Sequence, residues 1–195
     1  MLTIGRISML RSDKQIKSII RDNANLMKIL KIIHDLHLKQ AALAAGSIRN
    51  TVWQTLSEQP ITLINDIDVV FFDPTMPKST DRLIQQDLND CASEFNWQVK
   101  NEVYMNDYDF PNSPMFTSVE DAIAHFVETP TCIGAYLLDG GLKLIAPYGT
   151  DDLINMRCQP IPLFRKDEAH LKIYRNRILK KQWQRKWPRL TIDWH

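Results

Sequence analysis

Residues 65–73 read Asn-Asp-Ile-Asp-Val-Val-Phe-Phe-Asp, two acidic residues followed by an apolar run. Residues 61–72 around it are rich in isoleucine, valine and phenylalanine, which predicts a buried β-strand. Because side chains alternate along a strand, Asp66 and Asp68 are expected on the same face. Two carboxylates this close repel each other unless a shared proton or a divalent cation lies between them. The sequence therefore predicts a metal site held by Asp66 and Asp68.

The length and composition of the chain predict one compact domain. Its 195 residues are 44% hydrophobic, which is enough to fill a core. We expect a single domain over residues 1–195, with a core at about 25–160 and a basic C-terminal helix at about 168–186. No apolar run approaches 18 residues and no signal peptide follows Met1, so a cytoplasmic protein without a membrane segment is expected. The three cysteines are far apart and are expected to be ordinary reduced thiols.

The net charge of +1 hides a segregation of charge along the chain. Residues 63–152 carry sixteen acidic and four basic side chains, whereas residues 1–62 and 153–195 are both basic. An acidic centre with basic ends suits a site that collects cations at its centre and binds an anion from the flanks. The alternative is that solvated faces happen to cluster.

The spacing of apolar residues predicts helices and strands in irregular alternation. Helices are expected at 12–21 (opened by a capping box at Ser12), 23–38, 47–56, 79–94, 118–126, a short one from 150, and 168–186. Strands are expected at 61–72 and 97–105, with a hairpin at 131–138 and 142–146. This order indicates the α/β class in its mixed α+β form: a mixed β-sheet flanked by helices, with helical cover from both ends of the chain.

Gly46 and Ser47 lie about twenty residues before the acidic strand, at the predicted start of a helix. Backbone N–H groups at a helix start can hold a phosphate, and glycine lets the chain approach it closely. Ser47 Oγ can add a hydrogen bond, and Arg49 can pair with a phosphate or with an acid of the site. The alternatives are an ordinary helix start and a surface arginine.

This order of a Gly-Ser turn, a helix and a strand with Asp-hydrophobic-Asp resembles the nucleotidyltransferase superfamily that includes DNA polymerase beta. Residues 45–53 and 66–73 together resemble one bacterial branch, whose members are called nucleotidyltransferase family proteins. The resemblance covers roughly residues 25–190, with further matching stretches at 97–101, 128–131, 146–153 and 186–190. Each motif alone is weak, but their combination in the right order is more specific.

The resemblance implies an enzyme that moves a nucleoside monophosphate from an NTP to a hydroxyl acceptor and releases pyrophosphate. Asp66 and Asp68 would hold Mg²⁺ or Mn²⁺, because these ions prefer hard oxygen ligands and complete their shells with substrate phosphates. Gly46, Ser47 and Arg49 would bind the nucleotide. The acceptor stays open: RNA, a nucleotide, a protein hydroxyl or a small molecule all suit the charge pattern.

The catalytic form of this superfamily adds a third carboxylate on a neighbouring strand. Glu102 is the candidate if the even-numbered residues of the predicted strand 97–105 face the site. If the odd-numbered residues face it, Asn101 is there and the catalytic base is missing. Asp73, which precedes a proline, is expected to be a turn residue.

Two other functions remain open on the sequence. One is a non-catalytic nucleotide or nucleic-acid binder on the same scaffold, and the other is an antitoxin-like or regulatory partner that acts by contact. The C-terminal tryptophans Trp183, Trp187 and Trp194 lie among many basic residues and could stack on bases. Alternatively, they pack the final helix onto the domain with its basic side outward.

Overall fold

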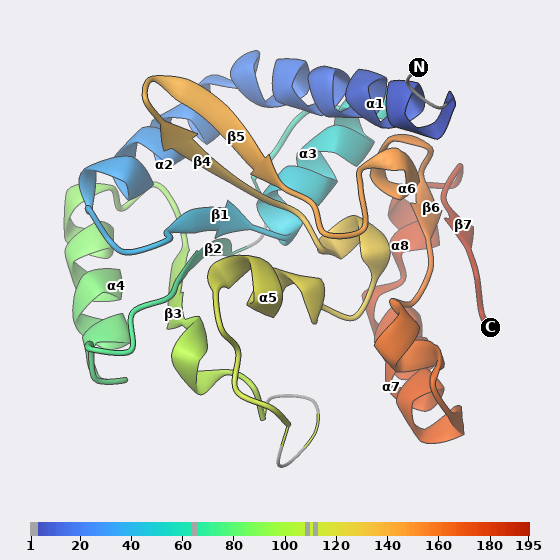
Figure 1. The fold of residues 1–195 in the computed structure, drawn as a ribbon. Helices are drawn as coiled ribbons and strands as arrows, with labels where there is room; N and C mark the ends of the chain where they lie inside the picture. The colour runs from blue at the N-terminus through green and yellow to red at the C-terminus, as the bar shows by residue number, and fades with distance from the viewer. Residues whose placement is uncertain (1–3, 64–65, 108–109, 111–112) are drawn as a thin grey trace.

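The computed structural model describes residues 4–63, 66–107, 110 and 113–195 (Figure 1). Asn65 of the acidic stretch and parts of the predicted strand 61–72 and of the loop before residue 113 lie outside the described residues. The described chain folds as a mixed α/β structure, which confirms the predicted class. Within the described ranges, none of the helices combines the length and the apolar character that crossing a membrane requires.

A five-stranded sheet in the order β3-β2-β1-β4-β5 forms the centre of the fold. Its strands are β1 (Ala42–Ala44), β2 (Ile67–Phe71), β3 (Trp97–Asn101), β4 (Gly134–Leu138) and β5 (Gly141–Ile145). β2 and β3 run parallel, with Asp68 opposite Gln98, and the other neighbouring strands pair antiparallel. The predicted hairpin is confirmed: Asp139 and Gly140 both have positive φ, as a two-residue turn between twisted strands requires.

Helices surround this sheet (Figure 1). They are α1 (Ile4–Arg21), α2 (Ala24–Asp35), α3 (Gly46–Leu56), α4 (Thr80–Cys91), α5 (Val119–Ala124), α6 (Asp151–Ile154), α7 (Glu168–Lys181) and α8 (Trp183–Lys186), with short 3-10 turns η1 (Glu102–Tyr104), η2 (Thr129–Thr131) and η3 (Pro162–Arg165). α1, α2 and α3 pack together beside the sheet, and α4 packs on β3. A small parallel pair, β6 (Arg157–Cys158) and β7 (Thr191–Ile192), lies near the C-terminus.

Most of the predicted helices are present because their local signals are strong. Asn23 caps α2 by accepting a hydrogen bond from Leu26 N at 3.0 Å, and the apolar residues of this helix are buried. The capping box predicted at Ser12 is wrong, because α1 begins at Ile4 and Ser12 lies inside it. The hydroxyl of Ser12 instead donates to Asp151 of α6 at 2.5 Å, so a tertiary contact uses the side chain that a cap would need.

The two predicted strands are shorter than expected. β2 begins only at Ile67, so Asp66 precedes the strand. β3 ends at Asn101, because the side chain of this residue caps the turn η1. The same side chain accepts a hydrogen bond from Asp73 N at 3.1 Å and donates one to Asp73 O at 2.8 Å. Asp73 is confirmed as a turn residue: its carboxylate accepts from Thr75 N at 2.9 Å.

The C-terminal segment is part of the core. The single helix predicted at 168–186 is wrong in one respect: it breaks at Gln182, whose φ of 49° lies in the left-handed region. This break turns Trp183 and Trp187 onto Trp53 of α3, with ring centroids 5.6 and 5.0 Å apart. Both tryptophans are buried, which supports the packing alternative over base stacking for this pair.

Candidate active site

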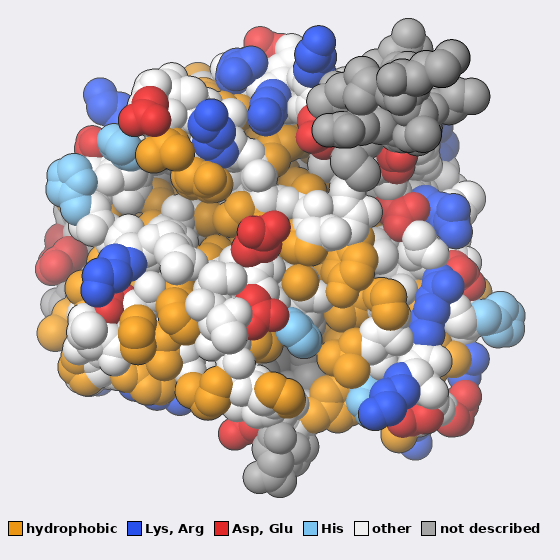
Figure 2. Space-filling model, in the orientation of Figure 1, with side chains coloured by type: hydrophobic (Ala, Val, Ile, Leu, Met, Phe, Trp, Pro, Cys, Tyr) orange, Lys and Arg blue, Asp and Glu red, His pale blue; other side chains and the backbone are white. Residues whose placement is uncertain are grey.

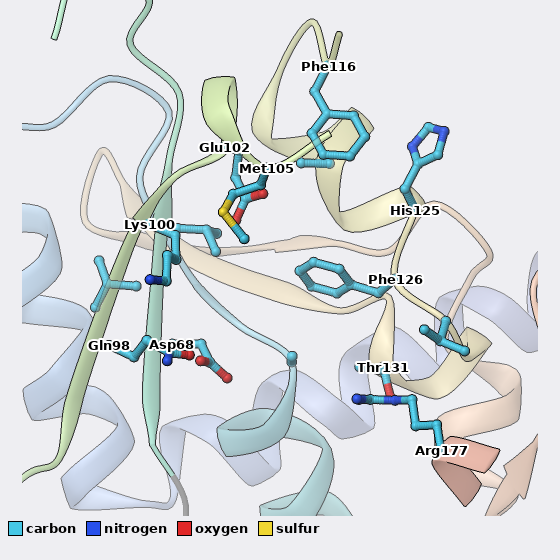
Figure 3. A pocket seen from close by; sticks show the side chains of 15 residues that line it. Asp68, Gln98, Lys100, Glu102, Met105, Phe116, His125, Phe126, Thr131 and Arg177 are labelled. Atoms are coloured by element: carbon cyan, nitrogen blue, oxygen red, sulfur yellow. The ribbon is translucent and has the colours of Figure 1, made fainter. Parts of the chain in front are cut away.

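A cavity of about 370 Å³ lies between β2 and β3 on one side and α5 with the segment after it on the other (Figure 3). Its lining comes from segments far apart in the sequence: Ala45, Asp68, Val69, Val70, Gln98, Lys100, Glu102, Met105, Phe116, Ala122, His125, Phe126, Val127, Thr131 and Arg177. In the face seen in Figure 2, a few acidic side chains lie near the middle, while other acids lie among the lysines and arginines nearer the edges. The cavity therefore combines carboxylates, cations and aromatic rings in one space.

Asp68 projects from β2 into this cavity and is half-buried. Burial raises the pKa of its carboxyl to about 6, and the nearby charge of Asp66 contributes in the same direction. Arg49, Lys181 and Arg177 act on the same pKa in the opposite sense. The cations therefore offset only part of the effect of burial and of Asp66, and the pKa of Asp68 stays above its ordinary value.

Glu102 also lines the cavity, immediately after β3. The even-numbered residues of this region, Gln98, Lys100 and Glu102, face the cavity, whereas Asn101 is fully buried in the contact with Asp73. Burial raises the pKa of Glu102 to about 8, with further contributions from the charges of Asp68 and Asp81. Of the two arrangements that the sequence left open, the structure has the one with Glu102 on the side of Asp68.

Asp66 lies just before β2 and is exposed. Its Oδ1 accepts a hydrogen bond from Asn96 Nδ2 at 2.5 Å, and its charge acts on the pKa of Asp68. Its side chain is not part of the cavity lining. The two predicted acids are therefore close enough for their charges to interact. Asp68 faces the cavity, whereas Asp66 lies just before the first residue of β2.

The Gly46-Ser47 turn lies beside the first of these acids. The hydroxyl of Ser47 donates to the backbone oxygen of Asp66 at 3.4 Å. Ala45, just before the turn, has a φ of 52° and lines the cavity, and its N–H donates to Ile133 O at 2.8 Å. The first bond of α3 runs from Arg49 N to Ala45 O, so the N–H groups before Arg49 lack an acceptor within the helix. The structure thus brings a helix start, whose first N–H groups have no acceptor within the helix, next to the backbone of Asp66.

Arg49 is not a surface arginine, because only 4% of it is exposed. Its guanidinium donates to Thr131 Oγ1 at 2.7 Å and to Asn50 Oδ1 at 2.9 Å, and it lies 4.1 Å from the ring centroid of Trp183. Burial lowers its pKa to about 10. The surface alternative is wrong for a reason outside the local sequence: α3 is covered by the C-terminal segment that carries Trp183.

The donor set around Asp68 suits a hard divalent cation, although it is small. Among the residues that the structure describes, no group of three or more histidine, cysteine or acidic side chains could hold a metal ion. Carboxylates from Asp66 and Asp68 nevertheless offer the oxygen ligands that Mg²⁺ prefers, and this ion usually takes only one or two carboxylates and completes its shell with water and phosphate. The residues present therefore fit such an ion when a phosphate is bound beside it.

Several cavity residues were not identified from the sequence. Gln98 and Lys100 follow from the alternation of β3, once it is known which face of the strand turns inward. Phe116, Phe126 and Arg177 had no such signal, because they reach the cavity through the folding of distant segments. In Figure 3, Arg177 extends toward Thr131, on the opposite side of the view from Asp68.

Comparison with known proteins gives this geometry a family context. Residues 31–192 match the model of a family described as nucleotidyltransferase. A solved structure described as revealing a CCA-adding enzyme head domain is similar to this chain, with 36% identity, a TM-score of 0.83, and 92% of this chain and 95% of the other covered. A tRNA-processing enzyme in an apo form shares the fold at 13% identity and a TM-score of 0.50, over 80% of this chain and 42% of its own. No match was found among curated proteins.

Proposed function

This chain belongs to the nucleotidyltransferase family, and from that premise we propose that it moves a nucleoside monophosphate from an NTP to a hydroxyl acceptor. The observation that carries the proposal is the shared cavity of Asp68 and Glu102, beside the contact between Ser47 and Asp66. Carboxylates next to the first N–H groups of a helix suit a reaction that must bind phosphates and develop negative charge on them.

The roles follow from position. Asp66 and Asp68 would hold Mg²⁺ or Mn²⁺, which when bound neutralises charge on the phosphates. The N–H groups at Gly46 and Ser47 orient the phosphate chain. Arg49 contributes indirectly. Its guanidinium donates hydrogen bonds to Thr131 and Asn50, and these bonds hold α3 in position.

Glu102 is the residue that we assign to proton transfer. The acceptor oxygen forms a bond to the α-phosphorus, the bond from this phosphorus to the bridging oxygen breaks, and pyrophosphate leaves. The proton of the acceptor hydroxyl passes to the carboxylate of Glu102. A carboxyl with a raised pKa is a stronger base once ionised, which suits this role.

We further propose that the acceptor is an RNA end. Support comes from the 36% identical solved structure that is described as a CCA-adding enzyme head domain. The basic side chains of α7 and α8 would attract a polyanionic acceptor. A nucleotide, a protein hydroxyl or a small molecule are the other acceptors to be compared.

The test is pyrophosphate release from each of the four NTPs with Mg²⁺ or Mn²⁺, with and without RNA. We expect Asp68→Asn to lower the rate by about 100-fold or more, since it removes a charge needed only when phosphates react. Asp90→Asn, an exposed acid on α4, is the matched control and should leave the rate unchanged. Equal rates in Asp68→Asn and the native protein would refute the proposal. Stabilisation by NTP and metal without turnover would instead favour the non-catalytic binder.

A further inference from the structure

One cation of α7, Arg177, lines the cavity, and two further cations, Lys181 and Arg49, lie behind the lining near it. Arg177 lines the cavity, and Lys181 follows it by four residues, so both lie on the same side of the helix. The charges of Arg177 and of Arg49 on α3 both lower the pKa of Lys181, so the three cations act on one another. The cluster is therefore built from two elements that are far apart in the sequence.

This cluster carries more positive charge than its surroundings neutralise. Burial lowers the pKa of Lys181, and repulsion from Arg177 and Arg49 lowers it further. Burial likewise lowers the pKa of Arg49, and Arg177 contributes to that change. Glu128 is the fully buried acid beside these groups, and its Oε1 is bonded to Arg177. Three cations are thus opposed by two carboxylates, Glu128 and Asp68, and a bound anion would stabilise the remaining positive charge.

The guanidinium of Arg177 is fixed through one nitrogen, which leaves its other N–H groups available to bind a ligand. Its Nε donates to Glu128 Oε1 at 2.5 Å, while its two terminal nitrogens have no hydrogen-bond partner within the described ranges. A guanidinium anchored through Nε presents its other N–H groups as a fork that matches phosphate oxygens. Figure 3 shows this side chain beside Thr131, with its nitrogen atoms reaching into the cavity.

We propose that Arg177 binds the triphosphate of the nucleotide opposite Asp68 across the cavity, and that Lys181, one helical turn further along α7, adds a second positive charge to the same phosphates. This inference rests on the proposed function and names the side chains that hold its substrate. A triphosphate fits better than an RNA backbone, because Arg177 is anchored to the buried Glu128 at one point of the cavity wall and presents a single compact fork there. A row of cations along an open surface would suit an extended strand instead.

The experiment is calorimetric titration of the full chain with inorganic tripolyphosphate, at low salt and without metal. Lys181→Gln should weaken binding by about ten-fold, because it removes a charge-assisted contact. Lys180→Gln, at the adjacent lysine, which is also exposed, removes the same net charge and should change binding by less than about two-fold. Arg177→Lys keeps a partner for Glu128 but loses the fork, and should weaken binding by about five-fold. Melting temperatures establish that the variants are folded.

The outcomes separate this inference from the proposed function. Equal tripolyphosphate affinity in Lys181→Gln and Lys180→Gln would overturn the inference, even if Asp68→Asn abolishes nucleotidyl transfer. Loss of binding to a single-stranded RNA in Lys181→Gln, with tripolyphosphate affinity retained, would also overturn it and assign the cations to the acceptor. A selective loss of tripolyphosphate binding would uphold it, even if none of the NTPs is turned over.

Discussion

Asp68 and Glu102 line the same cavity from neighbouring parallel segments, and the charge of Asp68 helps to raise the pKa of Glu102 to about 8. The register of β2 with β3 produces this relationship, because Asp68 lies opposite Gln98 and the same face then continues to Glu102. When both carboxyl groups are ionised, they repel each other, and this repulsion destabilises the site. Cations that enter the cavity relieve it.

The stability of the metal-free protein should therefore depend on pH. The pKa of Glu102 is about 8 in the folded chain, against an ordinary value of 4.5, so between these values the folded state holds a proton that the unfolded state has lost. Stability should fall as the pH rises through this range. In Glu102→Gln the fall should be smaller, so that at pH 8 its melting temperature exceeds that of the native protein by about 5 °C. Calorimetry in EDTA at pH 5 and pH 8 measures this.

Glu120→Gln is the control for that experiment, since Glu120 is exposed on α5. It should keep the full pH dependence of the native protein. The stability of Glu102→Gln should still fall somewhat as the pH rises. Part of this fall comes from Asp68, whose pKa of about 6 in the folded chain also exceeds its ordinary value. An unchanged slope in Glu102→Gln would show that the proton is held elsewhere.

Divalent cations should stabilise the protein in a way that depends on pH. Mg²⁺ or Mn²⁺ binds ionised carboxylates, so it should raise the melting temperature more at pH 8 than at pH 6, where protons compete at Asp68 and Glu102. Asp68→Asn should remove most of the increase, while Asp90→Asn should keep it. Thermal melts with and without the ion measure the difference. A full increase in Asp68→Asn would place the ion at another site.

Arg49 should be important for stability. Arg49→Met should lower the free energy of unfolding by about 3 kcal/mol, because Asn50 and Thr131 lose a buried partner and Trp183 loses its stacked neighbour. Arg49→Lys should restore little of it, since lysine lacks the planar fork. Urea denaturation measures the change, with the exposed Arg82→Met on α4 as the control. Similar stability of Arg49→Lys and the native protein would mean that charge alone matters.

Gly134 should tolerate no side chain without adjustment of Ile123. A Cβ at Gly134 would lie 2.7 Å from Ile123 Cδ1, whereas a Cβ at Gly141 of the same hairpin would meet nothing closer than 3.4 Å. Gly134→Ala should therefore destabilise the protein by about 2 kcal/mol, and Gly141→Ala by much less, as urea denaturation can measure. Ile123→Val removes the clashing methyl group, so the double variant should recover part of the loss. Equal stability of the two alanine variants would show that Ile123 does not restrict position 134.

Helices and turns that depend on neighbouring residues could be predicted from the sequence. The apolar stripe of residues 23–38 predicts α2, the turn at Asp139-Gly140 predicts the hairpin, and the break at Gly46 followed by Ser47 predicts α3, which begins one residue before the predicted start. Each of these depends on interactions between residues a few positions apart, which are visible as periodicity or as a capping residue. The alternation of a strand also identified Asp66 and Asp68 as candidates, whereas Glu102 was a candidate because the resemblance implies a third carboxylate.

Only the tertiary structure decided which candidates share a cavity. The side of β3 that turns inward depends on its register with β2. Asp66 precedes β2 and does not line the cavity, although its charge acts on Asp68. Arg49 is buried because a break at Gln182 brings Trp183 onto α3, and Arg177 joins Asp68 although more than a hundred residues separate them. Such contacts depend on how whole elements pack, and packing between distant segments leaves no periodic trace in the residues themselves.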